Sequence, residues 1–123
     1  MSEAPKILWL PKPEKHDYPA AFAYLNLIYK EEVVEKIVNK LKKANVVSFK
    51  AKDIFRASSL SLLGISNGHV YRDREKITNG TRLSPLLLVR DSLNGNLIIA
   101  DGYHRLCAVY SFDEDAIIPC KIV

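Results

Sequence analysis

Apolar residues follow a helical spacing in the first third of the chain. Phe22, Leu25 and Tyr29 lie on one face of a predicted helix, which begins at Asp17, close before Pro19. A second helical pattern covers residues 30–44 and ends in lysines, as the helix dipole favours. Its predicted buried side consists of Val33, Val34, Ile37, Val38 and Leu41. No Gly or Pro separates the two patterns, so they are compatible with one continuous helix.

Further along, short apolar runs replace the helical spacing. Residues 46–49, 85–89, 97–100 and 117–123 are predicted strands, and residues 91–96 form a hairpin turn. Residues 69–78 and 103–112 are predicted helices, the former ending at Gly80, and residues 52–56 begin a short helix or turn. Residues 6–10, closed by Pro11 and Pro13, form either an edge strand or a packed segment. This order predicts an α/β (α+β) fold with a small mixed sheet and flanking helices.

Composition limits the function classes. The chain has 123 residues, 48% of them hydrophobic, which suits one domain over residues 1–123, with residues 1–45 as a helical extension packed on it. The net charge of +4 favours phosphate or nucleic-acid partners only weakly. Cys107 and Cys120 lack the spacing of a zinc or redox pair. Without a signal segment or a membrane span, we expect a cytoplasmic protein; the sequence indicates no oligomeric state.

Candidate chemistry concentrates where the strand at 97–100 meets the helix at 103–112. Asp101 and Gly102 form the turn, and His104 and Arg105 lie in the first helical turn. The N-terminus of a helix has free N–H groups and a partial positive charge, so it can bind an anion, phosphate above all. Residues 101–105 are therefore the predicted functional site.

The second half of the chain resembles the ParB/sulfiredoxin superfamily of small α/β domains. The shared pattern is a Pro-hydrophobic strand, a G-x-[HR]-R-x-x-A turn and helix, and a strand opened by x-x-P. The matching residues are Pro85, Gly102, His104, Arg105, Ala108 and Pro119. The resemblance also places a second phosphate-contacting element near residues 66–77, where individual residues correspond poorly.

The resemblance implies a pocket for the phosphates of ATP or CTP with Mg²⁺. Gly102 would let the backbone approach the anion, and His104 and Arg105 would contact phosphate oxygens. Asp101 is open to two interpretations. It caps the helix, which is worth about 1 kcal/mol without any ligand, or it binds a phosphate-bound Mg²⁺ and acts in catalysis.

Tyr103 is a candidate nucleotide contact in the same turn, but it departs from the family pattern, because sulfiredoxins have their catalytic cysteine at this position. Sulfiredoxin activity is therefore not expected, and Cys107, one turn further on, is a core residue that does not replace it. Three further residues are candidates outside the turn: Asp53 as a catalytic acid or Mg²⁺ ligand, His69 as a general base or phosphate contact, and Lys52 as a phosphate contact.

Basic residues are also concentrated in residues 36–56. This segment is either a nucleic-acid contact or a solvated surface without aromatic residues interleaved for base stacking. Its cations are Lys36, Lys40, Lys42, Lys43, Lys50, Lys52 and Arg56. Two function classes follow: a nucleotide-dependent phosphotransferase or NTP hydrolase, and a non-catalytic module that binds a nucleotide, a nucleic acid such as DNA, or a partner. The chain is too short to carry the helix-turn-helix and dimerisation regions of a ParB clamp as well.

Overall fold

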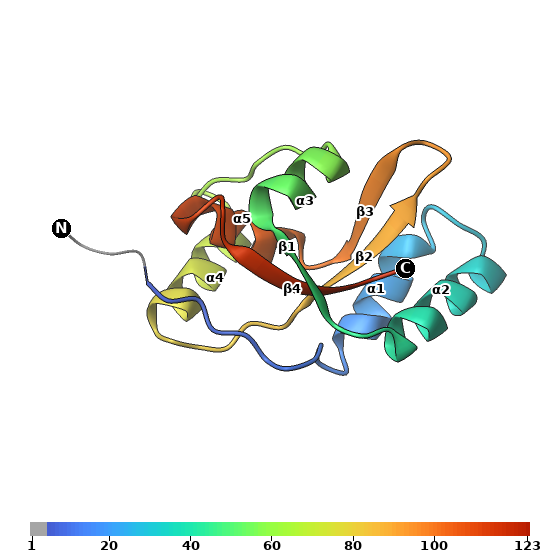
Figure 1. Cartoon of the computed structure of the whole chain (residues 1–123), viewed down its shortest axis with the longest axis horizontal. Helices are drawn as coiled ribbons and strands as arrows, with labels where there is room; N and C mark the ends of the chain where they lie inside the picture. The colour runs from blue at the N-terminus through green and yellow to red at the C-terminus, as the bar shows by residue number, and fades with distance from the viewer. Residues whose placement is uncertain (1–4) are drawn as a thin grey trace.

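The computed structural model describes residues 5–123, which form five α-helices and a four-stranded sheet (Figure 1). The elements are α1 (Asp17–Leu25), α2 (Glu31–Lys43), β1 (Val47–Lys50), α3 (Ala51–Ser58), α4 (Gly68–Thr78), β2 (Leu86–Asp91), β3 (Asn96–Asp101), α5 (Tyr103–Phe112) and β4 (Ile117–Ile122). This confirms the predicted α/β class with a small mixed sheet. Among the described residues, no helix is both long and apolar enough to span a membrane.

The sheet is open, with the strand order β1-β4-β2-β3. β2 and β3 form the predicted antiparallel hairpin, β1 is antiparallel to β4, and β4 is parallel to β2. A parallel pair needs a crossover connection, and the route from β2 to β4 runs through β3 and α5. The edge strand β3 therefore leads directly into α5, which is the position of the candidate site.

Helices cover both faces of the sheet, and this explains why its strands are apolar runs rather than alternating sequences. Leu86 and Leu88 belong to a core shared with α3, α4 and α5, whereas Leu87 and Val89 belong to a core shared with α1 and α2. Successive residues of a strand point to opposite faces, so β2 is buried on both sides. In Figure 1, α1 and α2 lie together at one end of the molecule, and α4 and α5 lie together at the other.

The N-terminal part forms two helices and not one. α1 ends at Leu25, and the chain turns through residues 26–30 before α2 begins with Lys30 in an extended conformation. The turn lets both helices pack on the same face of the sheet. Val34 is buried as predicted, but Val33 is 42% exposed, which corrects its assignment to the buried side.

Two contacts fasten the N-terminal part to the sheet. Residues 6–10 form a packed segment with a single bridge between Trp9 and Leu83, rather than a strand of the sheet. The carboxylate of Asp17, 1% exposed, accepts hydrogen bonds from the backbone N–H of Glu14 and from the hydroxyl of Ser84. Asp17 therefore does more than start a helix, because its side chain joins α1 to the segment before β2.

Candidate functional site

β3 passes into α5 through a single residue, Gly102. Its φ of 108° is left-handed, and a Cβ there would lie 2.7 Å from Cγ of Leu86 and 2.9 Å from Nη2 of Arg105. Only glycine fits this turn without displacing its neighbours. No side chain caps α5, so its leading N–H groups remain available for an anion.

Asp101 does not cap α5, which corrects the simpler interpretation of the sequence. Gly102 occupies the N-cap position, and Oδ2 of Asp101 instead accepts a hydrogen bond of 3.0 Å from Nη2 of Arg105. The two side chains are only 16% and 18% exposed. The left-handed glycine places Asp101 one residue before the cap, at a spacing from which its carboxylate reaches the first turn of α5.

The environment of Asp101 changes its acidity. Burial raises the pKa of this carboxyl from its ordinary value of 3.8 to about 6. The guanidinium of Arg105 lowers the pKa and the buried carboxylate of Asp17 raises it, so burial together with Asp17 outweighs the ion pair. Asp101 thus gains its proton close to neutral pH.

Arg105 has a hydrogen-bond donor without an acceptor. Its Nε is buried and makes no hydrogen bond to any residue between 5 and 123. Leaving a buried donor unsatisfied costs about 1–3 kcal/mol, and a bound water or ion is one usual explanation of such a group in a native structure. Arg105 therefore has hydrogen-bonding capacity that its pairing with Asp101 does not use.

α4 presents a row of polar side chains across from α5. His69, Arg72, Asp73 and Lys76 line the same pocket as the residue 101–105 turn, because their i, i+3, i+4 and i+7 spacing places them on one helix face. The sequence had identified the region and His69. It missed the other three residues, although this spacing was the signal that could have found them.

His69 and His104 face each other across the pocket, with ring centroids 4.7 Å apart. Burial lowers the pKa of His104, and the neighbouring His69 lowers it further, while Asp73 acts in the opposite direction. Two imidazolium rings at this distance would repel each other. The lowered pKa favours the neutral imidazole of His104 at neutral pH.

The pocket between α4 and α5 has a volume of about 270 Å³. We call it the polar pocket. Its permanent cations are Arg72, Lys76 and Arg105, and its carboxyl groups are Asp73 and Asp101. Arg105 is paired with Asp101 at 3.0 Å, and Lys76 lies 3.8 Å from Asp73. The three cations outnumber the two carboxyl groups, and two histidines also line the pocket, so its charge favours an anion over a cation.

Tyr103 and Cys107 belong to the structural frame of this pocket. The hydroxyl of Tyr103 donates to the carbonyl of Ser61 and so ties the loop after α3 to α5. Cys107 is fully buried, and burial raises the pKa of its thiol. A buried thiol of this kind is a poor nucleophile, which agrees with its prediction as a core residue.

Lys52 and Asp53 lie outside the polar pocket. Nζ of Lys52 pairs with Asp115 at 2.7 Å on the surface, and Asp53 lines a different pocket beside α3. The structure thus brings six of the predicted residues together, those of the turn 101–105 and His69, and separates Lys52 and Asp53 from them.

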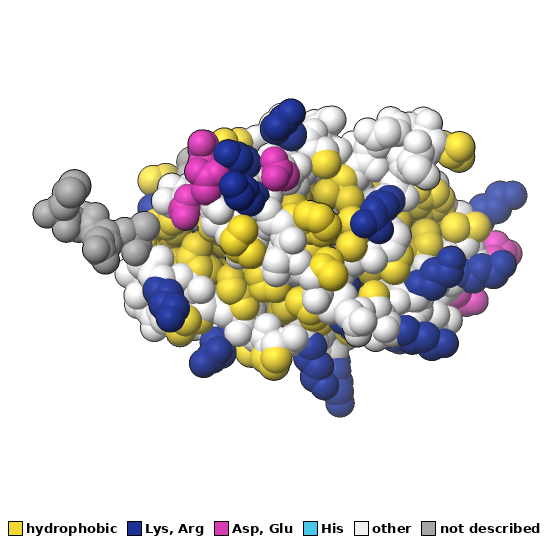
Figure 2. Space-filling view, viewed as in Figure 1, with side chains coloured by type: hydrophobic (Ala, Val, Ile, Leu, Met, Phe, Trp, Pro, Cys, Tyr) yellow, Lys and Arg dark blue, Asp and Glu magenta, His cyan; other side chains and the backbone are white. Residues whose placement is uncertain are grey.

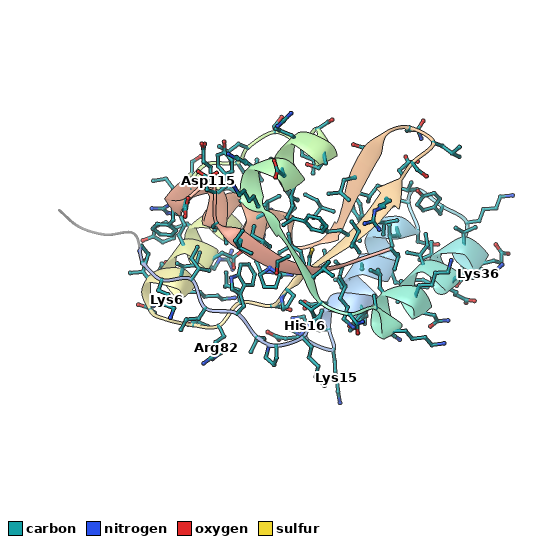
Figure 3. All side chains as sticks on the ribbon, viewed as in Figure 1. Lys6, Lys15, His16, Lys36, Arg82 and Asp115 are labelled. Carbon is teal, nitrogen blue, oxygen red and sulfur yellow. The ribbon has the colours of Figure 1, made fainter. Side chains whose placement is uncertain are left out.

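The basic segment is divided between the two sides of the sheet. α2, which carries Lys36, packs on one face of the sheet, and α3, which carries Lys52 and Arg56, packs on the other. Lys36 and Asp115, the partner of Lys52, lie far apart in Figure 3. Figure 2 shows the Lys and Arg side chains of one face scattered among apolar and neutral atoms. Nucleic-acid binding through this segment stays a prediction.

The described part of the chain contains no group of three or more His, Cys, Asp or Glu residues that could hold a metal ion. Mg²⁺ that is bound to phosphates needs fewer protein ligands, because it keeps several waters and takes only one or two carboxylates. Asp73 and Asp101 in the polar pocket fit that requirement.

Comparisons with known proteins leave the site to be interpreted from its own geometry. No protein-family model, no curated protein and no solved structure matches this chain. The resemblance to the ParB/sulfiredoxin superfamily therefore depends on the pattern of a few residues around the turn at Gly102.

Proposed function

We propose that this chain binds the phosphate groups of a nucleotide, ATP or CTP, in the polar pocket between α4 and α5. The observation that carries the proposal is the guanidinium of Arg105, which belongs to a residue that lines this pocket and keeps a donor without an acceptor among the described residues. Guanidinium groups suit phosphate because their donors form a planar fork that contacts two oxygens at once.

Two further features support an anion of several oxygens. The uncapped N-terminus of α5 offers backbone N–H groups beside Arg105. On the opposite wall, Arg72 and Lys76 are exposed and reach the same space from α4. A chain of phosphates can contact both walls of the pocket at once, whereas a single carboxylate contacts only one wall.

Phosphoryl transfer after nucleotide binding would depend on two groups, Asp101 and Mg²⁺. Asp101 is the group suited to general acid–base work, since its pKa of about 6 lies near the working pH. Mg²⁺, bound to the phosphates and to Asp73 or Asp101, would neutralise charge that develops during phosphoryl transfer. A phosphotransferase or NTP hydrolase would need both, while a nucleotide sensor would need neither.

The test is calorimetric titration of the protein with ATP, CTP, GTP and UTP, each with and without Mg²⁺. We expect saturable binding, and we expect Arg72→Gln to weaken it by about tenfold, as the loss of one charged hydrogen bond does. Arg72 is exposed, so this change spares the fold. Arg105→Ala should weaken binding by about 10- to 100-fold.

The matched control is Arg82→Gln. Arg82 is exposed, and its guanidinium contacts only the carbonyl of Trp9 among the described residues. Its replacement lowers the net charge by the same amount but should leave the affinity unchanged. Equal affinities of the wild type, Arg72→Gln and Arg105→Ala would reject the polar pocket as the phosphate site.

A further inference from the structure

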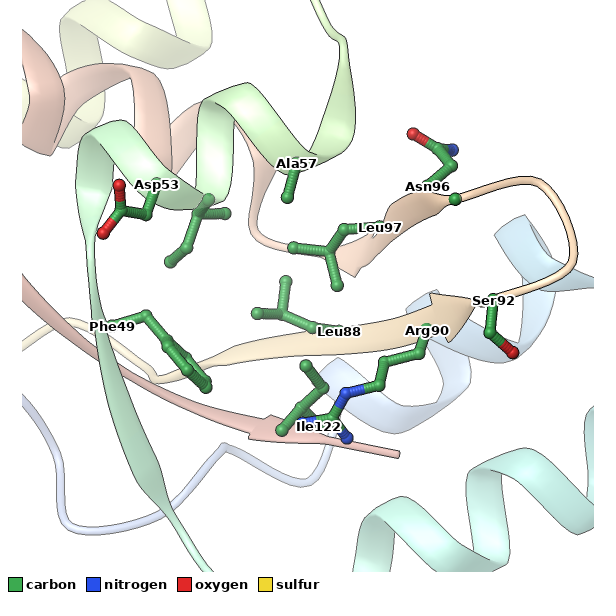
Figure 4. A pocket seen from close by; sticks show the side chains of 11 residues that line it. Phe49, Asp53, Ala57, Leu88, Arg90, Ser92, Asn96, Leu97 and Ile122 are labelled. Carbon is green, nitrogen blue, oxygen red and sulfur yellow. The ribbon is translucent and has the colours of Figure 1, made fainter.

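A second pocket lies on the sheet beside α3, with a volume of about 410 Å³. We call it the apolar groove. Leu88, Leu97 and Ile122 from three strands line it, together with Phe49 of β1, and Ile54 and Ala57 of α3 form the opposite side (Figure 4). α3 is only eight residues long, and this part of the sheet is left open toward the β2–β3 hairpin.

The groove is separate from the polar pocket. Leu97 lies near the start of β3 and Asp101 at its end, and four steps at roughly 3.3 Å per residue put about 13 Å between their backbones. No residue lines both pockets. Whatever occupies the groove is therefore recognised independently of the nucleotide proposed above.

Arg90 gives the groove its chemical preference. In Figure 4 its side chain runs along the groove toward Ile122, while the carboxylate of Asp53 points away from Leu88. Burial raises the pKa of the Cys120 thiol on this face to about 11, and the charge of Arg90 acts in the opposite direction. Within residues 5–123, the side chain of Arg90 forms no ion pair or hydrogen bond.

We propose that the apolar groove binds a small amphipathic anion: a free aliphatic or aromatic carboxylate. The apolar body of this ligand packs against Phe49, Leu97 and Ile122, and its charged group pairs with Arg90. The volume of the groove lies in the range of small-molecule sites, and such sites combine an apolar lining with a few polar groups that fix orientation. A guanidinium favours a carboxylate, because their planar geometries match.

The probe for this site is anilinonaphthalene sulfonate, a fluorescent aromatic anion, titrated in the presence of saturating tripolyphosphate to block the polar pocket. We expect saturable fluorescence that decanoate displaces and decanol displaces far less. Arg90→Gln should weaken binding of the probe by about fivefold, as expected for one partly exposed charged contact.

Two matched variants separate the groove from non-specific binding. Ala57→Trp places a large side chain in the groove at an exposed helical position, so it should abolish binding without unfolding the protein. Arg82→Gln removes a charge elsewhere and should leave binding unchanged. Thermal unfolding of each variant would identify any change caused by a loosened fold.

Three results would overturn the proposal. The first is probe fluorescence that Ala57→Trp does not alter, and the second is equal displacement by decanoate and decanol. The third is the absence of saturable binding, which would leave the groove as a surface for a larger partner. None of these results bears on nucleotide binding, which is measured by calorimetry in the polar pocket, so the two proposals fail separately.

Discussion

The polar pocket and the apolar groove lie at opposite ends of the same strand, β3, and differ in how their key groups are held. In the polar pocket, Arg105 is largely buried and its position is set by a left-handed glycine and by Asp101. In the apolar groove, Arg90 is exposed and has no described partner. The first site holds charged groups that are largely buried, whereas the second is an open apolar groove on the surface of the sheet. Changes to Arg105 or Asp101 should therefore affect stability and binding together.

The largest effect is expected from Gly102→Ala. An alanine there must adopt a left-handed conformation, and its Cβ would meet Cγ of Leu86 at 2.7 Å. Left-handed strain and overpacking together should cost about 2–5 kcal/mol of the free energy of unfolding. Urea denaturation would measure the loss.

Gly95→Ala, in the turn of the hairpin beside the apolar groove, is the matched control. Gly95 also has a positive φ, of 59°, but nothing lies within 4 Å of the added Cβ. The cost should be only the strain, about 1–2 kcal/mol. Equal losses in the two variants would show that Leu86 yields and that the turn at Gly102 is not tightly packed.

The next effect concerns pH. Because the carboxyl of Asp101 has a pKa of about 6 in the fold and 3.8 ordinarily, the native state binds the extra proton between these values. This residue therefore makes the free energy of unfolding fall as the pH rises from about 4 to about 6, by on the order of 2 kcal/mol. In denaturation across this range, the wild type should lose stability relative to Asp101→Asn as the pH rises.

A free energy of unfolding that rises with pH relative to that of Asp101→Asn would contradict this prediction. If the wild type gains stability over Asp101→Asn as the pH rises, the ion pair with Arg105 outweighs burial and the contribution of Asp17. The polar pocket would then resemble an ordinary salt bridge and would lose its candidate for acid–base chemistry.

The sequence predicts those elements correctly whose pattern lies in neighbouring residues. The apolar runs of the strands and the turn at Gly102 follow from burial on both faces and from the conformational freedom of glycine. Val33 was assigned to the wrong side of α2 because neighbouring valines share a hydrophobic stripe, and only the packing against the sheet decides which one is buried. The break between α1 and α2 also depends on packing, because both helices lie on the same face of the sheet.

The candidate site was found in part for a related reason. The turn 101–105 is contiguous, so its residues could be identified together. Arg72 and Lys76 show a helical spacing, but which polar face of α4 turns toward α5 depends on tertiary packing. The influence of Asp17 on Asp101 joins distant parts of the chain and leaves no local signal.

A smaller effect is expected for His104. Its pKa is lowered, chiefly by burial, and a bound anion should favour its protonated form. The affinity for sulfate, whose charge is constant in this range, should therefore rise by about threefold to tenfold from about pH 7.5 to about pH 5.5. His104→Gln should reduce this rise, and Asp101→Asn should separate the contribution of the carboxyl. An identical pH profile in His104→Gln would place the ring outside the anion contact.

The smallest effects are expected for Lys52 and Asp53, and they test the separation of the two pockets directly. Lys52→Ala breaks an exposed ion pair with Asp115 and should leave the affinity for ATP unchanged, because Lys52 lines neither pocket. Asp53→Asn should also leave ATP binding unchanged, but it removes a negative charge from the rim of the apolar groove. The affinity for anilinonaphthalene sulfonate should then rise by about twofold, as expected for one exposed like charge. A loss of ATP binding in either variant would instead join residues 52–53 to the phosphate site, as the sequence first suggested.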